Sequence, residues 1–167
     1  MTTTERAAGR RQVFFHDPSA PVASVVAPSV FAVVRRGDGR LLLVRRLDSG
    51  VWELPGGQVD VGETASGTAV RETAEEAGVD VVVTGIAGLF TDPGHVVRGV
   101  GGQVRQQFVL LLRARPVGGA PRGDQQETSA AAWVAIGDLR GLDMEPAVCA
   151  WLDQVLDDDG GAAPHLG

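Results

Sequence analysis

The sequence predicts a single domain of the α/β class, and three observations lead to this prediction. The chain has 167 residues, close to the length of one average domain. Short apolar runs rich in β-branched residues alternate with turn-forming residues, which is typical of strands. Two segments, residues 64–77 and 146–156, have the spacing and flanking residues of helices.

Turn-forming residues mark the boundaries of the first elements. Residues 30–36 are predicted to form a strand, Gly37-Asp38-Gly39 a turn, and residues 41–46 the returning strand. A short extended piece ends at Pro55, and a loop then leads to the helix of residues 64–77, which Gly78 is placed to terminate. The later elements are strands at 79–90, 103–115 and 131–136, loops at 91–102 and 116–128, and a helix at 146–156.

The two ends of the chain are expected to lie outside the domain. Residues 1–27 are predicted to form an N-terminal extension of short extended pieces that prolines separate. The domain itself is expected to cover residues 28–156, and residues 157–167 to form a flexible tail. The apolar stretch of residues 13–28 leads to the hypothesis that the extension takes part in a homodimer interface.

Composition excludes several classes of partner. The net charge is −6, which argues against a nucleic-acid polymer because binding to such a polymer needs a basic face. No apolar run approaches the roughly 18 residues of a membrane span, and residues 1–11 do not resemble a secretory signal. Cys149 is the single cysteine, so no intramolecular disulfide and no clustered-thiol zinc site can form. We therefore expect a cytoplasmic protein whose partner is a small molecule.

Three glutamates crowd one side of the first predicted helix. At about 100° per residue, Glu76 lies about 40° from Glu72 in one direction and Glu75 about 60° in the other. Unit charges about 4 Å apart repel by roughly 4 kcal/mol at an effective dielectric constant near 20. A hard divalent cation would relieve this repulsion, whereas a solvated glutamate face is the alternative. The opposite side is predicted to pack on the sheet and carries Val70, Thr73, Ala74 and Ala77.

The helix belongs to a longer pattern of fixed spacing. Gly57 is followed after five residues by Glu63, and after seven more by Arg71-Glu72-Thr73-Ala74-Glu75-Glu76-Ala77-Gly78-Val79. This segment resembles the Nudix box of the MutT/Nudix hydrolase family, in which Thr73 is the one departure, at a position of bulky apolar residues. Residues 41–57 and 133–139 resemble the segments on either side of the box. The resemblance covers about residues 28–156 and implies the Nudix fold, a mixed β-sheet sandwiched between helices (α/β/α).

The resemblance also implies a metal site, with Mg²⁺ as the cofactor and Mn²⁺ as the alternative. Arg71 matches an arginine that orients a carboxylate of the box, and Glu63 matches a carboxylate that braces the loop before the helix. The resemblance leaves the catalytic base open between Glu72 and Glu75. The residues that match metal ligands of the family are Glu72, Glu75, Glu76, Glu127 and the carbonyl group of Gly56.

The implied reaction is hydrolysis of a nucleoside diphosphate linked to a group X. Its products are a nucleoside monophosphate and phosphorylated X, or pyrophosphate when X is phosphate. Both a nucleotide sugar or similar ADP-ribose-like compound and a nucleoside triphosphate fit as substrates. One alternative is a regulatory module of the same fold that binds nucleotide without turnover, and another is the isomerase branch of the fold, which needs a cysteine in the cleft.

Substrate specificity is expected to come from residues outside the box. Arg105 and Gln107 open a long strand beside the expected cleft, although a solvated strand end explains them equally well. Side-chain alternation predicts that Arg45 or Arg46 faces the cleft, and Arg45 is taken as the candidate. His95 lies in the predicted loop at 91–102 and is a further candidate for contact with the substrate.

Overall fold

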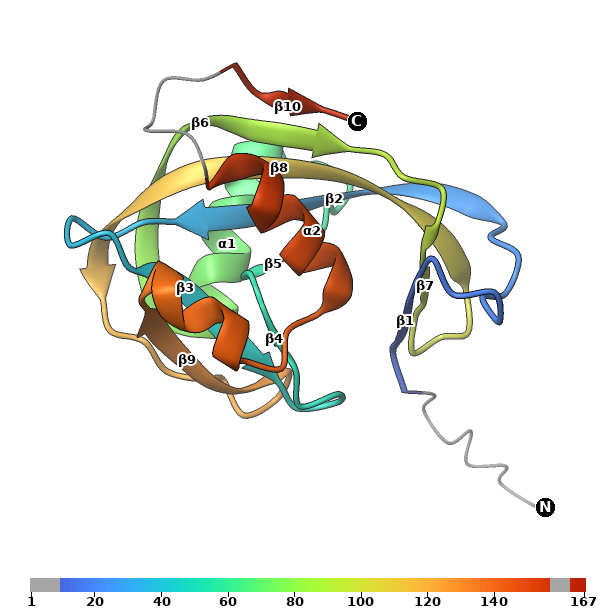
Figure 1. Ribbon diagram of the computed structural model, residues 1–167, viewed down its shortest axis with the longest axis horizontal. Coiled ribbons are helices and arrows are strands. Elements are labelled where there is room, and N and C mark those ends of the chain that lie inside the picture. The colour runs from blue at the N-terminus through green and yellow to red at the C-terminus, as the bar shows by residue number, and fades with distance from the viewer. Residues whose placement is uncertain (1–9, 157–162) are drawn as a thin grey trace.

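The computed structural model describes residues 10–156 and 163–167, and a mixed sheet forms its centre (Figure 1). The strands of this sheet are β1 (Gln12–Phe15), β2 (Val25–Val34), β5 (Gly56–Gln58), β6 (Val79–Phe90), β7 (His95–Arg98), β8 (Val104–Gly119) and β10 (His165–Leu166). Strand β8 pairs in parallel with β2 on one side, and antiparallel with β7 and then β6 on the other. Strand β1 extends the sheet beyond β7, and β5 extends it beyond β2.

A smaller sheet and the helices complete the domain. The smaller sheet has the order β4-β3-β9, with β3 in its centre. In Figure 1, α1 lies behind the central sheet and α2 lies in front of it. These elements are β3 (Leu41–Arg46), β4 (Trp52–Glu53), β9 (Thr128–Val134), α1 (Ala65–Ala77), α2 (Pro146–Val155) and the 3₁₀ helix η1 (Ile136–Gly141).

Alternation along β2 divides the core into two layers. Phe31 and Val33 belong to a buried cluster with Trp151 of α2. Their neighbours Val30 and Ala32 belong to a second cluster, with Ala69 of α1. A strand that is apolar on both faces is expected only where both faces are covered. The expected sandwich of a mixed sheet between helices is therefore confirmed.

Helix α1 begins and ends where the sequence predicts. The Thr64 hydroxyl accepts a hydrogen bond from the Gly67 amide, as an N-cap should. Gly78 takes a left-handed conformation (φ 69°) and donates its amide to the Ala74 carbonyl. The face that packs on the sheet differs from the prediction. Val70 is 39% exposed, and the buried residues are Thr68, Ala69, Thr73, Glu76 and Ala77.

Strand β2 contains a proline at a position that does not weaken the central sheet. The sequence predicted a strand from residue 30, after Pro28, but β2 begins at Val25. The Pro28 carbonyl accepts the Val59 amide from the side of β5. Because N and C=O of one strand residue point the same way, the missing N–H also lies on that side. The parallel ladder to β8 therefore loses no donor at Pro28.

The predicted loop at 91–102 contains a strand. Residues 95–98 form β7, which pairs with the first residues of β8. A tight turn joins the two strands, in which Gly99 donates its amide to Gln103 and Gly102 has a φ of 84°. The glycines that suggested a long loop instead close a hairpin.

Both predicted ends contribute to the sheet. Strand β1 lies within the predicted extension and pairs with β7, so this part is not separate from the domain. Within the predicted tail, His165 and Leu166 pair in parallel with Gly88 and Leu89 of β6, so this part is not free chain. Residues 1–9 and 157–162 lie outside the described residues. The homodimer through residues 13–28 stays a prediction.

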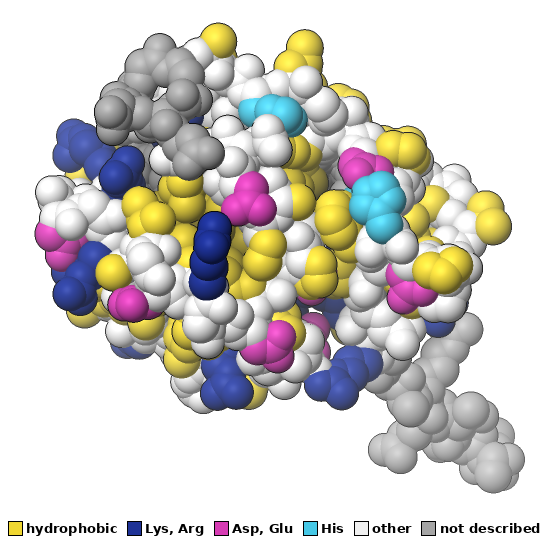
Figure 2. All heavy atoms as spheres, in the orientation of Figure 1, with side chains coloured by type: hydrophobic (Ala, Val, Ile, Leu, Met, Phe, Trp, Pro, Cys, Tyr) yellow, Lys and Arg dark blue, Asp and Glu magenta, His cyan; other side chains and the backbone are white. Residues whose placement is uncertain are grey.

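The face that carries α2 is mixed in character. Figure 2 shows exposed hydrophobic side chains there, interspersed with charged ones. Cys149 is exposed on this helix and lines a groove together with Leu139 and Leu152. None of the helices in the described ranges is long and apolar enough to cross a membrane.

His95 is buried at the junction of β1, β7 and α2. It is 5% exposed, and its ring contacts those of Phe15 and Trp151. Burial, together with the nearby positive charges of Arg11 and Arg105, lowers the pKa of His95 to about 4. The imidazole is therefore neutral in the folded protein near neutral pH.

We predict that His95 makes stability depend on pH. Below pH 6.5 the unfolded chain takes up a proton that the native histidine does not take up until about pH 4. The free energy of unfolding should therefore fall as the pH falls through this window, by about 3 kcal/mol in total. Urea unfolding at pH 7 and pH 5 should show a smaller fall for His95→Gln than for the original protein. Equal falls in the two proteins would contradict the prediction.

Candidate functional site

A cleft of about 230 Å³ lies between α1, β5 and the ends of β2 and β8. It is open to solvent on the side of residues 58 and 60 and is lined largely by charged and polar groups. Six of the residues predicted from the sequence line it: Gly56, Glu72, Glu76, Arg105, Gln107 and Glu127.

Glu76 is the most deeply buried carboxylate of the predicted metal site. It is 2% exposed, accepts the Gly56 amide at 3.0 Å and accepts Arg46 Nη1 at 3.3 Å. Burial raises its pKa well above the ordinary value for a glutamate. Gly56 packs so closely on β2 that a Cβ atom there would lie 2.3 Å from the Val30 carbonyl oxygen. Glycine thus allows the backbone to reach both β2 and Glu76.

Glu72 occupies space that the next glycine leaves free. A Cβ atom on Gly57 would lie 2.5 Å from Glu72 Oε1. The Glu72 side chain is 14% exposed, and burial raises its pKa despite the opposing charge of Arg71. The two consecutive glycines therefore bring the backbone of β5 against two carboxylates of α1.

Arg71 joins the loop before α1 to the carboxylates of the helix. Its Nε and Nη2 atoms donate to Glu63 at 2.6 and 3.0 Å, in a two-pronged contact. Its Nη1 atom donates to Glu72 at 3.0 Å and to Glu75 at 3.1 Å. Hydrogen bonds from Arg71 and from the Thr68 hydroxyl lower the pKa of Glu63 to about 2. Glu63 is thus ionised, and it joins the Asp60 amide of the loop to Thr68 and Arg71 of α1.

Glu75 stands apart from the other two glutamates of the helix. Its side chain is 58% exposed, contacts Arg71 and does not line the cleft. The three carboxylates that the helical wheel placed together are therefore buried to very different degrees. The wheel gave their relative angles correctly but not the direction in which the core lies.

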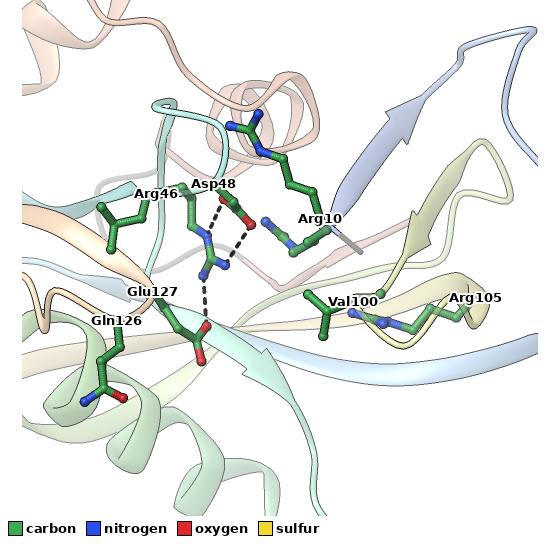
Figure 3. Close-up of a pocket in the computed structure, with 10 residues that line it drawn as sticks. Arg10, Arg46, Asp48, Val100, Arg105, Gln126 and Glu127 are labelled. Carbon is green, nitrogen blue, oxygen red and sulfur yellow. Dashed lines mark hydrogen bonds and ion pairs between the residues drawn. The ribbon is translucent and has the colours of Figure 1, made fainter. Parts of the chain in front are cut away.

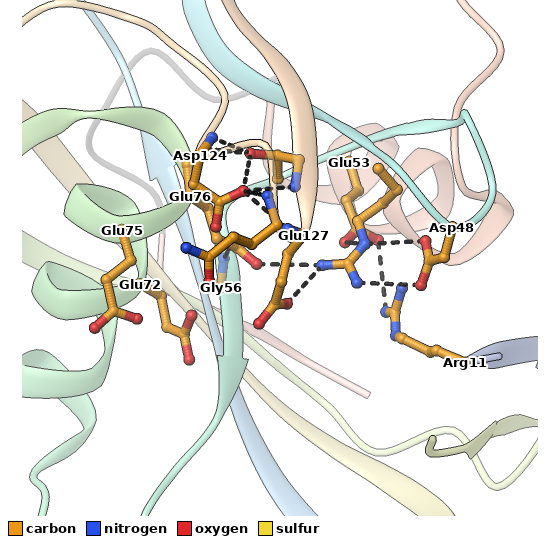
Figure 4. Close-up of polar contacts among 12 residues, drawn as sticks. Arg11, Asp48, Glu53, Gly56, Glu72, Glu75, Glu76, Asp124 and Glu127 are labelled. Atoms are coloured by element: carbon orange, nitrogen blue, oxygen red, sulfur yellow. Dashed lines mark hydrogen bonds and ion pairs between the residues drawn. The ribbon is translucent and has the colours of Figure 1, made fainter. Parts of the chain in front are cut away.

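Arg46 connects the cleft to the smaller sheet. It is 8% exposed and lies within 3.2 to 3.6 Å of four carboxylates (Figure 4). These carboxylates come from the turn after β3, from β4, from α1 and from the residue before β9. They belong to Asp48, Glu53, Glu76 and Glu127.

The residues of the cleft fit a hard divalent cation in their donor chemistry. Glu72, Glu76 and Glu127 supply carboxylate oxygens, the ligands that Mg²⁺ prefers, and Figure 4 shows Glu72 and Glu127 pointing to the same side. Arg71 and Arg46 pair with these oxygens. As the side chains stand, no three acidic, histidine or cysteine residues of the described chain converge tightly enough to enclose an ion.

Two predicted substrate contacts need correction. Arg45 does not line the cleft, because its Nε atom donates to the Gly50 carbonyl at the surface and Arg46 takes the inward position. Side chains alternate along β3, so Arg46 shares the face of Leu42 and Val44 that is turned toward α1, and Arg45 lies on the other face. His95 packs on Phe15 and Trp151 instead of lining the cleft.

The sequence predicted Arg105 and Gln107 correctly as residues beside the cleft. Arg105 donates to Gln107 Oε1 at 3.3 Å, and the Ser29 hydroxyl donates to the same oxygen at 3.2 Å. Cys149 lies on α2 and does not line the cleft, so the cysteine needed by an isomerase is not supplied there.

Besides the exposed Asp60, two charged residues of the cleft were missed. Glu53 is 2% exposed on β4, and its charge between the apolar neighbours Trp52 and Leu54 was a signal that the sequence offered. Arg11 contacts Glu53 at 3.6 Å, and nothing local in the sequence indicated it. Its position depends on the pairing of β1 with β7, which is a long-range contact.

Comparison with known proteins gives consistent matches. The family model described as NUDIX domain matches residues 25–157. A MutT-like protein of Streptomyces ambofaciens is 35% identical over 148 residues, covering 89% of this chain and 84% of that protein. A Bacillus subtilis (strain 168) protein named "Putative 8-oxo-dGTP diphosphatase" is 34% identical over 109 residues, covering 65% and 66% of the two chains. The crystal structure of a NUDIX hydrolase from Nitrosomonas europaea has a TM-score of 0.73 at 19% identity, covering 100% and 98%, and so shares the fold.

We predict that Arg46 stabilises the fold through the carboxylates it contacts. Arg46→Gln leaves Glu76 buried without a positive partner and Glu53 with Arg11 alone, and should lower the free energy of unfolding by about 3 kcal/mol. Arg45→Gln removes the same charge from the adjacent exposed residue, and should cost less than about 1 kcal/mol. Urea unfolding of both variants at pH 7 measures the difference. Equal effects would show that the buried ion pairs are not what stabilises this region.

Proposed function

The chain belongs to the Nudix family of pyrophosphohydrolases, and on this premise we propose that it hydrolyses a nucleoside diphosphate linked to a group X. The products are a nucleoside monophosphate and phosphorylated X, or pyrophosphate when X is phosphate. One observation carries the proposal: Glu72 and Glu76 of α1 and Glu127, which precedes β9, line one cleft beside Gly56.

The proposal includes a divalent cation, Mg²⁺ or Mn²⁺. Glu72, Glu76, Glu127 and the Gly56 carbonyl would hold it, because they offer oxygen donors beside the cleft. When bound, such a cation neutralises charge on the diphosphate oxygens and favours attack of water at phosphorus. Glu75 stays a proposed ligand from the motif.

The proton acceptor for the attacking water is proposed to be Glu72. Of the two candidates, Glu72 lines the cleft and Glu75 does not. A general base must come within hydrogen-bond reach of the proton that it accepts. Arg71 donates hydrogen bonds to both Glu63 and Glu72 and is therefore proposed to orient Glu72.

Substrate contacts are proposed for the beginning of strand β8. Arg105 and Gln107 of β8 lie across the cleft from α1 and offer donors to a phosphate or a base. The name of the Bacillus subtilis relative supports a nucleoside triphosphate as substrate, and a nucleotide sugar stays the alternative.

We predict turnover that depends on metal and on the buried glutamates. The protein is incubated with Mg²⁺ and a panel of nucleoside triphosphates, ADP-ribose and nucleotide sugars, and released phosphate is measured after phosphatase coupling. Glu72→Gln and Glu76→Gln should each lower kcat at least about 100-fold, because the carboxylate charge is lost. Removal of the metal with EDTA should abolish activity. Asp153→Asn, an equivalent change on the exposed side of α2, should leave it unchanged.

The same panel separates an enzyme from a binding module. Binding of Mg²⁺ and nucleotide, measured by calorimetry, with no turnover of any compound would overturn the proposal in favour of nucleotide binding alone. Circular dichroism of each variant shows whether a loss of activity reflects a loss of structure.

A further inference from the structure

A second hollow of about 500 Å³ continues from the cleft toward β1 and the turn between β7 and β8. The two spaces share Arg11, Arg46, Arg105 and Glu127 in their walls. Figure 3 shows Arg105 and Val100 on one side of this hollow, with Arg46, Asp48 and Glu127 on the other. A molecule bound at the carboxylates could therefore extend into the hollow without crossing protein.

Two arginines reach the hollow from the same face of the sheet. Val97 of β7 pairs with Val13 of β1 on one side and with Arg105 of β8 on the other. Paired residues share a face, and so do residues two apart along a strand. Arg11 lies two residues before Val13 and therefore projects on the same face as Arg105.

The guanidinium of Arg105 is held in the wall of the hollow without a balancing charge. No carboxylate of the described residues lies within ion-pair distance of it, and its Nε atom donates a hydrogen bond to the neutral Gln107. A Cβ atom on Gly99 would lie 3.1 Å from Arg105 Nη1, so glycine leaves room for this group. Burial and the charge of Arg11 both lower the pKa of Arg105.

The positive charge of Arg11 is only partly neutralised by carboxylates, whereas that of Arg46 is fully neutralised. Among the described residues, Arg11 has one carboxylate within ion-pair distance, Glu53 at 3.6 Å, and that carboxylate also contacts Arg46. Asp48 and Glu145 line a neighbouring hollow together with Arg11 but form no ion pair with it. Arg46 is surrounded by four carboxylates. An oxyanion between Arg11 and Arg105 would therefore remove repulsion between two like charges. The planar guanidinium groups offer paired donors that match phosphate oxygens.

We propose that Arg11 and Arg105 form a subsite for a phosphate group that lies beyond the diphosphate of the substrate. The subsite makes a nucleoside triphosphate a better substrate than a nucleotide whose X is an uncharged sugar. This inference rests on the proposed function, because it places the diphosphate at the carboxylates of the cleft. Arg10 lines the same hollow and adds positive charge.

The first test compares two substrates with Mg²⁺ present. For dGTP, Arg11→Gln and Arg105→Gln should each lower kcat/KM about tenfold or more, because a charged hydrogen-bond donor is lost. For ADP-ribose the change should be less than about twofold, since no phosphate reaches the subsite. Arg115→Gln removes the same charge from an exposed position on β8 and should change kcat/KM for neither substrate. Gly99→Ala keeps both arginines but crowds Arg105, and should lower kcat/KM for dGTP and not for ADP-ribose.

The second test is a binding measurement that needs no turnover. Calorimetry with inorganic triphosphate, without metal, should show affinity that falls about tenfold in Arg11→Gln and Arg105→Gln and is kept in Arg115→Gln. If the variants lose this affinity but the original protein hydrolyses none of the compounds, the proposed function is wrong and the phosphate subsite is supported. The proposed subsite is contradicted if the variants change kcat/KM equally for dGTP and ADP-ribose, or change it for neither. It is also contradicted if the original protein has a higher kcat/KM for ADP-ribose than for dGTP. Unchanged activity toward ADP-ribose also shows that a variant is folded.

Discussion

The buried guanidinium of Arg46 is the constraint on which the arrangement of the cleft depends. It contacts Asp48 and Glu53, which are close to it in the sequence, and also Glu76 and Glu127, which are 30 and 81 residues away. Without a positive charge between them, Glu53 and Glu76 would be two repelling carboxylates with little exposure to solvent. Arg46 thereby allows α1 to bring Glu76 against β5 while the residue before β9 brings Glu127 to the same space.

The carboxylate wall and the arginine wall of the cleft come from different regions of the chain. The loop, α1 and β5 form one continuous stretch, in which two glycines bring the backbone close to Glu72 and Glu76. The opposite wall is built by the hairpin of β7 and β8 and by β1, which joins the hairpin by pairing with β7. Strand β2 links the two walls, because it pairs with β5 on one side and with β8 on the other. One sheet therefore holds the proposed metal site and the proposed substrate contacts at a fixed distance from each other.

The local features of the chain were predictable, and its long-range pairings were not. The bounds of α1 and of β6 follow from caps, spacing and β-branched residues, and the structure agrees with the prediction. The strand β7 was hidden because the glycines and the proline that flank it suggest a loop when the partner strand is unknown. Arg11 was missed for the same reason, since β1 forms only by pairing with β7. Alternation predicted one inward arginine at the end of β3, but which of the two faces inward depends on where α1 packs, and that is a long-range contact.

The short strand β10 has a consequence for how molecules of this protein meet one another. Strand β6 pairs with β8 along one side, and an uncovered strand edge is a template for cross-molecule pairing and aggregation. His165 and Leu166 occupy part of the other side, beside Gly88 and Leu89. A Cβ atom on Gly88 would lie 3.1 Å from His165 Cβ, so the glycine makes this close approach feasible. The protein thus shields this stretch of edge with its own backbone, and a foreign strand would have to displace it first.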